Sequence, residues 1–350
     1  MLAIGADVHK KTTTFFALDE EGNPVKDFNK KFRRVPSDAE HYSEVCGYLK
    51  DCEYQILMEN SSKTHDTFWI MEELCMNVIV GHSPDLKKIT QSDKKTDDND
   101  AEELAVYELA RLSGAKQFSI CYMCDKRTMM DRQLCRMAKT EMVDQGRIKR
   151  RMRSHGLIFG IDLDRFGDLR TKKAAKLISE LNNPLLCILM RQLNESLERQ
   201  SDLEELIESR FKGNATFERI DEIPYFGITT AAYLTSYIAD IARFDNSKAF
   251  VASLGLAPRE RNSGEKTSHC HITKKGDPHA RWLLIQAVIG HVRGCPDSPV
   301  TLYFNKKNGG SIQERKERGE NVIMNRPALI AAAAKMAVII YTLVIKDRHW

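Results

Sequence analysis

Four acidic residues are spaced so that their carboxylates could share divalent cations. Asp7 ends one apolar run, Glu59 ends another, and Asp97 and Asp100 follow in the segment KKTDDND. Residues three apart on a helix lie on one face, with Cβ atoms about 5–6 Å apart. Oxygen-only ligands suit Mg²⁺ or Mn²⁺, and two such ions about 3.5–4 Å apart clamp the attacking and leaving oxygens of a phosphodiester. For any one of these acids a solvated carboxylate is the simpler interpretation, but their joint placement favours a metal site.

A loop containing Gly and Pro is the second region suited to phosphate chemistry. From residue 259 to 281 the sequence holds six basic residues against three acidic ones, and Ser263 lies among them. Upstream, IDEIPYFGITTAAYLTSYI resembles a helix-hairpin-helix, whose turn presents backbone N–H groups to a phosphate. A plain pair of core helices is an equal alternative for that segment. We predict nucleic-acid contacts for Arg259, Arg261, Lys266, Lys274, Lys275 and Arg281.

The segment 126–154 is predicted to be one long helix that binds nucleic acid. It carries ten Lys or Arg against three Asp or Glu, whereas the net charge of the whole chain is only +4. Such a density of like charge repels itself unless an anionic partner binds, although a solvated helix face is the alternative. The run RIKRRMR supplies the candidate contacts Arg147, Lys149, Arg150, Arg151 and Arg153.

The elements that must position the acids form an α/β pattern. Apolar residues over 2–8 and 13–18, followed by an alternating stretch from Val25 to Arg34, predict a three-stranded antiparallel meander. Helices are expected over 37–49 and 64–75, and short strands over 54–58 and 77–80. Strands that alternate with helices after a meander are typical of an α/β domain. The acids then lie on a strand, a second strand and a helix, in the order of a ribonuclease H-like fold.

The remainder of the chain is predicted to be mostly helical. Leucines recur at three- and four-residue steps over 186–207, which predicts a helical hairpin with the preceding helix over 174–181. A coiled-coil seam and an ordinary amphipathic helix explain this periodicity equally well. With a boundary at Gly213, we predict domains over 1–125, 126–212 and 213–350. The apolar segment 328–345 holds a central lysine, which favours a core helix over a membrane span.

Composition excludes several classes of protein. The chain has 350 residues with 42% hydrophobic residues, so it can bury a core of two or three domains. The nine cysteines are an odd number with a single CxxC, which fits reduced thiols better than a disulfide framework or a zinc ribbon. Charged residues interrupt the N-terminal apolar run, so we expect no secretory signal and a cytoplasmic protein.

Six motifs in this order resemble one family over nearly the whole chain: IGADVHK, LMEN, KKTDDNDAEELA, IPYFGITTAA, FVASLGLAPRERNSGEK and ITKKGDPHARWLL. They are similar to the IS110/IS1111 group of bacterial insertion-sequence transposases. The resemblance implies an α/β N-terminal RNase H/RuvC-like domain, a helical coiled-coil insert and a mostly α C-terminal transposase domain. It also implies a catalytic metal-binding quartet of Asp7, Glu59, Asp97 and Asp100, a nucleophilic Ser263, and guidance by a bridge RNA.

The expected function is therefore DNA transposition by strand cleavage and rejoining through a serine nucleophile, with Mg²⁺ or Mn²⁺ as cofactor. Expected partners are the DNA of the element ends and target, a bridge RNA and further copies of the chain in a dimer or tetramer, without a membrane. We expect it in the bacterial cytoplasm, associated with the nucleoid. Ser268 is the rival nucleophile. The alternatives are a metal-dependent Holliday-junction resolvase or RNase H-like nuclease that uses water, and a non-enzymatic nucleic-acid-binding module.

Overall fold

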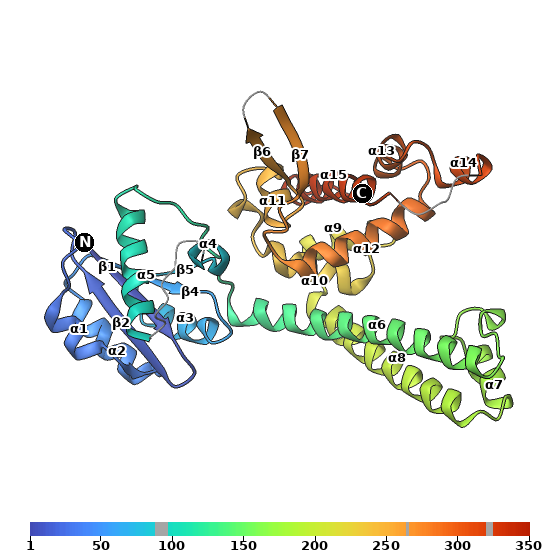
Figure 1. Cartoon of the computed structure of the whole chain (residues 1–350), viewed down its shortest axis with the longest axis horizontal. Helices are drawn as coiled ribbons and strands as arrows, with labels where there is room; N and C mark the ends of the chain where they lie inside the picture. The colour runs from blue at the N-terminus through green and yellow to red at the C-terminus, as the bar shows by residue number, and fades with distance from the viewer. Residues whose placement is uncertain (88–96, 264–265, 320–324) are drawn as a thin grey trace. The chain divides into compact units, whose positions relative to one another are not determined.

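The computed structural model describes residues 1–87, 97–263, 266–319 and 325–350, without the side chains of 87, 97–98 and 260–270. The chain forms two compact units, Met1–Lys126 and Arg127–Trp350, shown in Figure 1. Each unit has its own hydrophobic core, and each is described by itself below. The boundaries predicted for three domains stay predictions.

A five-stranded mixed sheet organises the first unit, with strand order β3-β2-β1-β4-β5. Strand β1 lies at the centre, antiparallel to β2 and parallel to β4. Strand β5 continues the parallel half, and the short β3 pairs antiparallel with β2. The strands are β1 (Leu2–Val8), β2 (Thr12–Leu18), β3 (Val35–Pro36), β4 (Tyr54–Glu59) and β5 (Val78–Gly81).

Helices cover both faces of this sheet. On one face, side chains of α1 (Lys26–Phe32), α2 (Ala39–Leu49) and α3 (Thr64–Glu73) share a core with alternate residues of β1, β2 and β4. On the other face, Leu57 of β4 packs with residues of α4 (Ser83–Lys87) and α5 (Asp97–Leu112). The predicted alternation of strands and helices is thus confirmed for this part of the chain, whereas its RuvC-like identity stays a prediction.

The predicted third strand of the meander is wrong, because residues Lys26–Phe32 form helix α1. Phe28 and Phe32 are four residues apart and both are buried, which is a helical spacing. Asn29 replaces the missing strand at the edge of β2, since its side-chain oxygen accepts from the N–H of Ala17 at 2.7 Å and its amide donates to the carbonyl of Ala17 at 3.1 Å. The Asn29 side chain thereby pairs with both backbone groups of Ala17, and the N–H of Val25 also donates to the Ala17 carbonyl at 3.0 Å.

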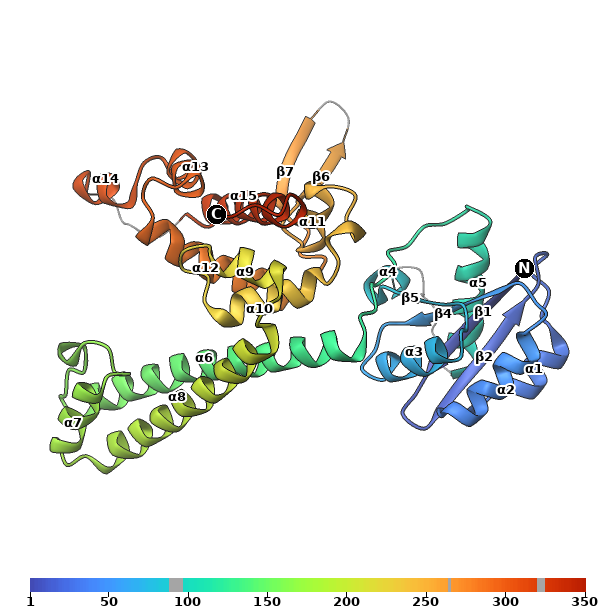
Figure 2. The ribbon, with the colours of Figure 1, turned by 180° about the vertical axis from the view of Figure 1, so that it is seen from behind.

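Two long helices form an antiparallel hairpin in the second unit, visible in Figure 2. They are α6 (Lys126–Ile158) and α8 (Pro184–Phe211), with α7 (Lys172–Glu180) between them in sequence. Asp131 near the start of α6 pairs with Arg210 near the end of α8, whereas Glu141 pairs with Arg199 further along. The long partner of α8 is therefore α6, and α7 adds only a short contact to the same core.

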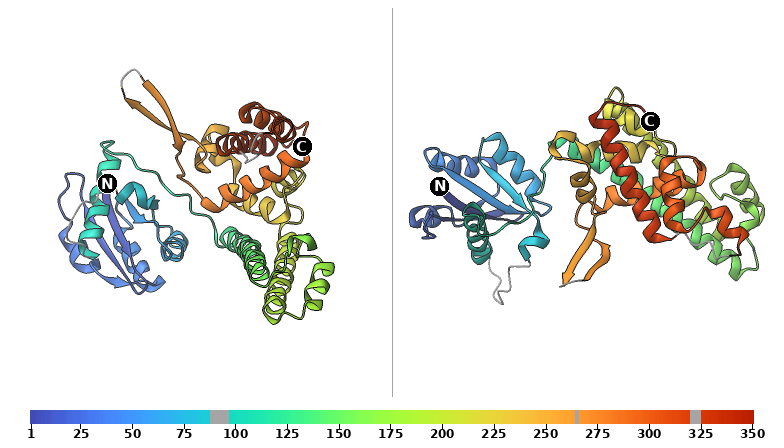
Figure 3. Two further views of the ribbon diagram at one scale, coloured as in Figure 1. Left: turned by 45° about the vertical axis from the view of Figure 1, so that its right-hand side comes forward. Right: turned by 90° about the horizontal axis from the view of Figure 1, so that it is seen from above.

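The rest of the second unit is a helical bundle with one projecting β-hairpin, seen from two further directions in Figure 3. Helix α15 (Arg326–Ile345) lies in its core: it is long and apolar enough to span a membrane, but half of its apolar window is buried against other helices. This confirms the predicted core helix. The elements are α9 (Ala215–Asp221), α10 (Ile228–Ile238), α11 (Ser247–Ser253), β6 (Pro258–Ser263), β7 (Lys266–Ile272), α12 (Pro278–Gly294), α13 (Pro299–Asn308), α14 (Ile312–Glu317) and α15 (Arg326–Ile345).

Candidate active site

The carboxylates of Asp7 and Glu59 belong to neighbouring parallel strands in register. Ala6 of β1 pairs with Met58 of β4, so the next residue of each strand is one of the two acids. Side chains alternate along a strand, and Gly5 and Leu57, two residues earlier, both face helix α5. Asp7 and Glu59 therefore lie side by side at the carboxyl ends of their strands, on the face that α5 covers.

Helix α5 runs opposite to these strands, which brings its first turn to the same edge. Near its end, Arg111 binds the buried Glu108 at 2.6 Å and also donates to Gln55 at the start of β4. Burial raises the pKa of Glu108, and the adjacent guanidinium opposes that rise. Because the end of α5 meets the beginning of β4, its beginning, with Asp97 and Asp100, lies toward Glu59.

Gly5 allows α5 to approach the sheet. A Cβ on Gly5 would lie 2.0 Å from the carbonyl oxygen of Ala101 and 2.5 Å from the N–H nitrogen of Ala105. The buried face of α5 thus includes Ala101 and Leu104, and residues 97 and 100 lie one turn before them on that face. The side chain of Asp97 lies outside the described residues. Among described side chains, no three of His, Cys, Asp or Glu gather as a metal site, so the quartet stays a prediction.

His9 also lies at this edge, although it was not among the predicted site residues. Its Nε2 lies 2.9 Å from a carboxylate oxygen of Asp7, whose side chain is 18% exposed. The motif DVHK could have indicated His9 in the sequence, because His9 follows Asp7 by only two residues and so stays close to it.

The turn after Glu59 is closed by Thr64, which donates its hydroxyl to the carbonyl of Glu59 at 2.7 Å and accepts a hydrogen bond from the N–H of Ser61 at 3.0 Å.

Ser263 ends strand β6 of the projecting hairpin, where it pairs with Lys266 of β7. Its rival Ser268 pairs with Arg261, so both serines lie on one hairpin. The predicted loop is therefore wrong for residues 258–263 and 266–272, because backbone pairing between the two segments forms strands. The side chains of Arg261, Ser263, Lys266 and Ser268 lie outside the described ones, so their roles stay predictions.

The base of the hairpin is tied to the end of α11. Gly276 has φ +124°, and a Cβ there would lie 1.8 Å from the carbonyl oxygen of Ser253. Arg281 donates to the carbonyl of Leu254 at 3.0 Å, and Arg259 donates to that of Thr273 at 3.1 Å. Two of the predicted phosphate-binding arginines thus also hold the hairpin base, whereas Lys274 and Lys275 are exposed.

Asp277 joins the hairpin base to helices α6, α10 and α12. Its carboxylate accepts hydrogen bonds from the hydroxyl of Tyr233 at 2.7 Å and from the N–H groups of His279 and Ala280 in the first turn of α12. Arg136 of α6 lies 3.4 Å away. Burial disfavours the charge, but these donors outweigh it and hold the pKa of Asp277 below its ordinary value.

The basic side chains of helix α6 fall into two groups that make different contacts. In the N-terminal half of α6, Arg132 donates to the carbonyl of Ser236 at 2.9 Å, and Lys139 lies 3.0 Å from the imidazole of His279. Burial lowers the pKa of Lys139, and the ammonium also lies over the ring of Trp282. Arg132 and Lys139 therefore belong to the core of the second unit. The predicted nucleic-acid contacts lie further along α6, at residues 147–153.

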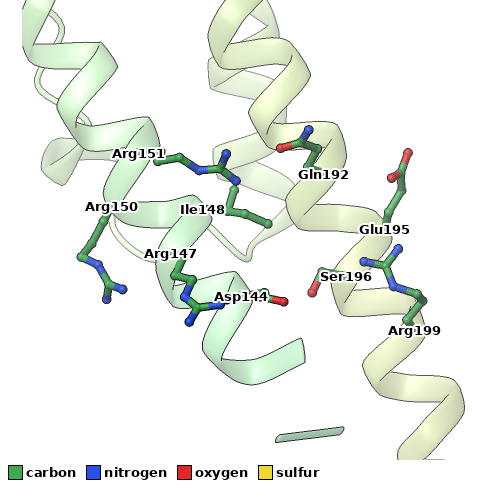
Figure 4. A pocket seen from close by; sticks show the side chains of 9 residues that line it. All are labelled: Asp144, Arg147, Ile148, Arg150, Arg151, Gln192, Glu195, Ser196 and Arg199. Atoms are coloured by element: carbon green, nitrogen blue, oxygen red, sulfur yellow. Dashed lines mark hydrogen bonds and ion pairs between the residues drawn. The ribbon is translucent and has the colours of Figure 1, made fainter. Parts of the chain in front are cut away.

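That further part of α6 borders a cavity of about 740 Å³ between α6 and α8, shown in Figure 4. Arg147, Arg150 and Arg151 line it from α6 and Arg199 lines it from α8. Arg147 pairs with Asp144 at 2.7 Å but is 64% exposed. Of the other two predicted contacts, Lys149 is half-buried, and Arg153 pairs with Asp164 at 2.6 Å.

Comparison with known proteins places the chain in a family. A family profile described as "Transposase IS116/IS110/IS902 family" matches residues 217–298, from α9 to the end of α12, including the hairpin. The transposase for insertion sequence element IS1111A of Coxiella burnetii is 26% identical over 99% of this chain and 90% of its own length. The chain belongs to the IS110/IS1111 family of transposases. The transposase for insertion sequence element IS1328 of Yersinia enterocolitica is 30% identical over 40% of this chain and 44% of its own length.

For this IS110/IS1111 transposase, the family match and the site geometry fall on different parts of the chain. The profile covers the hairpin that bears Ser263, whereas the acids belong to the first unit. The match to the IS1111A transposase extends over both units. Both candidate parts of the active site therefore belong to the shared length of the two transposases.

Proposed function

We propose that this transposase cleaves and rejoins DNA strands through Ser263, assisted by divalent cations at Asp7, Glu59, Asp97 and Asp100. The observation that carries the proposal is the in-register pairing of β1 with β4, which aligns Asp7 with Glu59 at the edge where α5 begins. The strand order and the helices on both faces support a RuvC-like fold for this unit.

The acids fit a hard cation by donor chemistry. All four are carboxylates, which are the ligands that Mg²⁺ and Mn²⁺ prefer. The dipole of α5 favours negative charge at its first turn, where Asp97 and Asp100 lie. When bound, the cations would neutralise the phosphate and lower the effective pKa of the serine hydroxyl.

In the proposed reaction, the Ser263 hydroxyl oxygen attacks phosphorus as the bond to the leaving deoxyribose oxygen breaks. The hydroxyl proton ends on that leaving oxygen, and a phosphoserine ester conserves the bond energy. The hydroxyl oxygen of a second strand then attacks the phosphorus, the bond from phosphorus to the Ser263 oxygen breaks, and the proton returns to that oxygen. The strands are thus rejoined without ATP. Lys274 and Lys275 supply positive charge near the hairpin.

The partners of the reaction are also part of the proposal. We assign a bridge RNA to the arginines of the cavity between α6 and α8, because four guanidinium groups line it against two carboxylates. The acids and the serine belong to different units, so copies of the chain in a dimer or tetramer could contribute them separately. The cytoplasm, at the nucleoid, is the expected location.

Trapping of protein–DNA adducts on denaturing gels tests the proposal. Wild type should form covalent adducts in Mg²⁺, Ser263→Ala should form none, and Ser268→Ala should form them as wild type does. Free cut ends without adducts would instead favour the hydrolytic nuclease. If two copies share one site, a mixture of Asp7→Asn and Ser263→Ala proteins should recover adduct formation that neither shows alone.

A further inference from the structure

A cavity of about 560 Å³ lies next to the acid edge of the first unit. Thr14 and Phe16 of β2 form its floor, α1 forms one wall, and Asn99 and Glu102 of α5 form the other. The family profile, which covers residues 217–298, and the predicted nucleic-acid contacts both lie outside α1. We call this cavity the α1 groove. It is lined by Lys26 and Lys30 of α1 and by Arg33, which directly follows the helix.

Strand pairing places the α1 groove directly beside Asp7. Thr14 in its floor is the antiparallel partner of Asp7, so the two side chains are neighbours on one face of the sheet. On the other side of the groove, Asn99 precedes Asp100 in the first turn of α5. A chain lying in the α1 groove would therefore pass the proposed metal site.

The cations of the α1 groove lie on a single stripe. Lys26 and Lys30 are four residues apart, which places them on one side of α1, and Arg33 follows three residues later at the C-cap, where the backbone is still helical. All three side chains are exposed. Phe28 and Phe32 are buried on the other side, and Asn29 ties the helix to Ala17. The stripe is thus held in place by the packing of α1.

The balance of charge favours an anionic occupant. Among the described residues that line the groove, Lys26 and Lys30 contribute ammonium groups, and Glu102 contributes a carboxylate on the opposite wall. Within the described part of the chain, the ammonium groups of Lys26 and Lys30 form no ion pair. Two lysines kept side by side without a carboxylate between them repel each other, and a bound phosphate relieves that repulsion.

The floor of the groove adds an aromatic ring. Phe16 is partly exposed there, although its neighbours Phe15 and Ala17 are buried. Grooves that bind single strands combine a cationic wall along the backbone with aromatic rings on which bases stack. The α1 groove has both features on adjacent surfaces.

We propose that the α1 groove binds the phosphodiester backbone of the nucleic-acid strand that is cleaved at the acid edge, with a base on Phe16. The position of the cleaved bond in this inference rests on the proposed function, whereas the binding of a strand in the groove does not. DNA and RNA both offer a phosphodiester backbone and stacking bases. Because the strand cleaved in the proposed function is DNA, we expect single-stranded DNA to bind more tightly than RNA.

Salt-dependent binding of the full-length protein tests the groove. Fluorescence anisotropy in EDTA would measure affinity for a labelled single-stranded DNA of the element end, and for RNA of the same sequence, over a range of KCl concentrations. In Lys26→Gln/Lys30→Gln, we expect the log–log salt slope for DNA to fall by about 1.4, since each lost single-strand contact removes about 0.7. Phe16→Leu should weaken DNA binding at least about fivefold with little change in slope.

The matched control is Lys31→Gln/Arg34→Gln, which removes two cations of the same segment that do not line the cavity. It should bind like wild type. An unchanged slope in the groove variant, or an equal fall in the control, would overturn the α1 groove. A slope that falls for RNA alone would overturn the assignment to the cleaved strand.

A crosslinking arm separates this inference from the proposed function. A photoreactive amino acid at Lys30 should crosslink to nucleotides next to the cleaved bond. If wild type binds with the expected slopes but never cuts DNA, the proposed function fails while groove binding stands. If wild type cuts and the crosslinks lie far from the cut, the groove assignment fails while the function stands.

Discussion

Gly5 of β1 lies against the carbonyl oxygen of Ala101 in α5, with room for hydrogen but not for a methyl group. This contact sets the distance between the strand that bears Asp7 and the helix that bears Asp97 and Asp100. The geometry of the proposed metal site thus depends on a residue that has no functional group of its own.

Gly5→Ala should separate α5 from the sheet. The added Cβ meets backbone rather than a flexible side chain, so we expect a loss of about 1–3 kcal/mol in the free energy of unfolding, and loss of strand cleavage. Gly47→Ala is the control, because a Cβ there has open space within helix α2 and should stabilise it by about 0.5–1 kcal/mol. Urea unfolding together with a cleavage assay measures both effects; equal stability of the two variants would refute the close approach.

Asp7→Asn or Asp100→Asn should abolish strand cleavage while the fold is kept. Each change removes one ligand charge without creating a cavity, so the affinity for the metal falls while the packing of the core is unchanged. Cleavage by wild type should stop in EDTA and return with Mg²⁺ or Mn²⁺. Asp51→Asn, which removes an exposed charge of the same unit, should cut normally. Full activity of either quartet variant in Mg²⁺ would exclude the quartet.

Replacing Arg147, Lys149, Arg150 and Arg151 together by Gln should weaken nucleic-acid binding and flatten its salt dependence. Each lost phosphate contact lowers the log–log slope by about 0.7–0.9. The control replaces Lys172, Lys173 and Lys176 of α7, which do not line the cavity. Should the slope of the arginine variant equal that of wild type, this part of α6 would be a solvated face.

Asp277→Asn should destabilise the second unit in a pH-dependent way. The pKa of Asp277 is lowered in the folded state, so its charge stabilises the fold above the unfolded pKa, near 4, and this contribution is lost as pH falls through the lower folded pKa. At pH 7 we expect a loss of about 1–3 kcal/mol, because Arg136 and Tyr233 lose a charged acceptor.

Urea unfolding between pH 7 and pH 2 measures the effect, and the difference between wild type and Asp277→Asn should shrink toward the acid end. Asp240→Asn is the matched control, since Asp240 is exposed and caps only a short 3-10 turn. A difference that stays constant over this range would show that the Asp277 charge contributes nothing.

Much of the architecture could be predicted from the sequence, because local patterns decide it. The apolar runs that end at Asp7 and Glu59 predicted two strands, and the structure pairs them in register. The long charged helix predicted over 126–154 is also present as α6, and α8 follows from the periodicity of its leucines. The family likewise follows from short motifs in a fixed order, which requires no coordinates.

Other features depended on contacts between distant segments. In residues 25–34 apolar and polar residues alternate only weakly. The segment is a helix because Phe28 and Phe32 pack on the sheet and Asn29 bonds to Ala17. Arg132 belongs to the core because a carbonyl of α10 lies within its reach, although in sequence it looks like any other cation of α6. The α1 groove joins Lys30 to Asn99 across 69 residues of chain. Charge and hydropathy patterns describe one segment at a time, so the partners of a side chain become known only when the chain has folded.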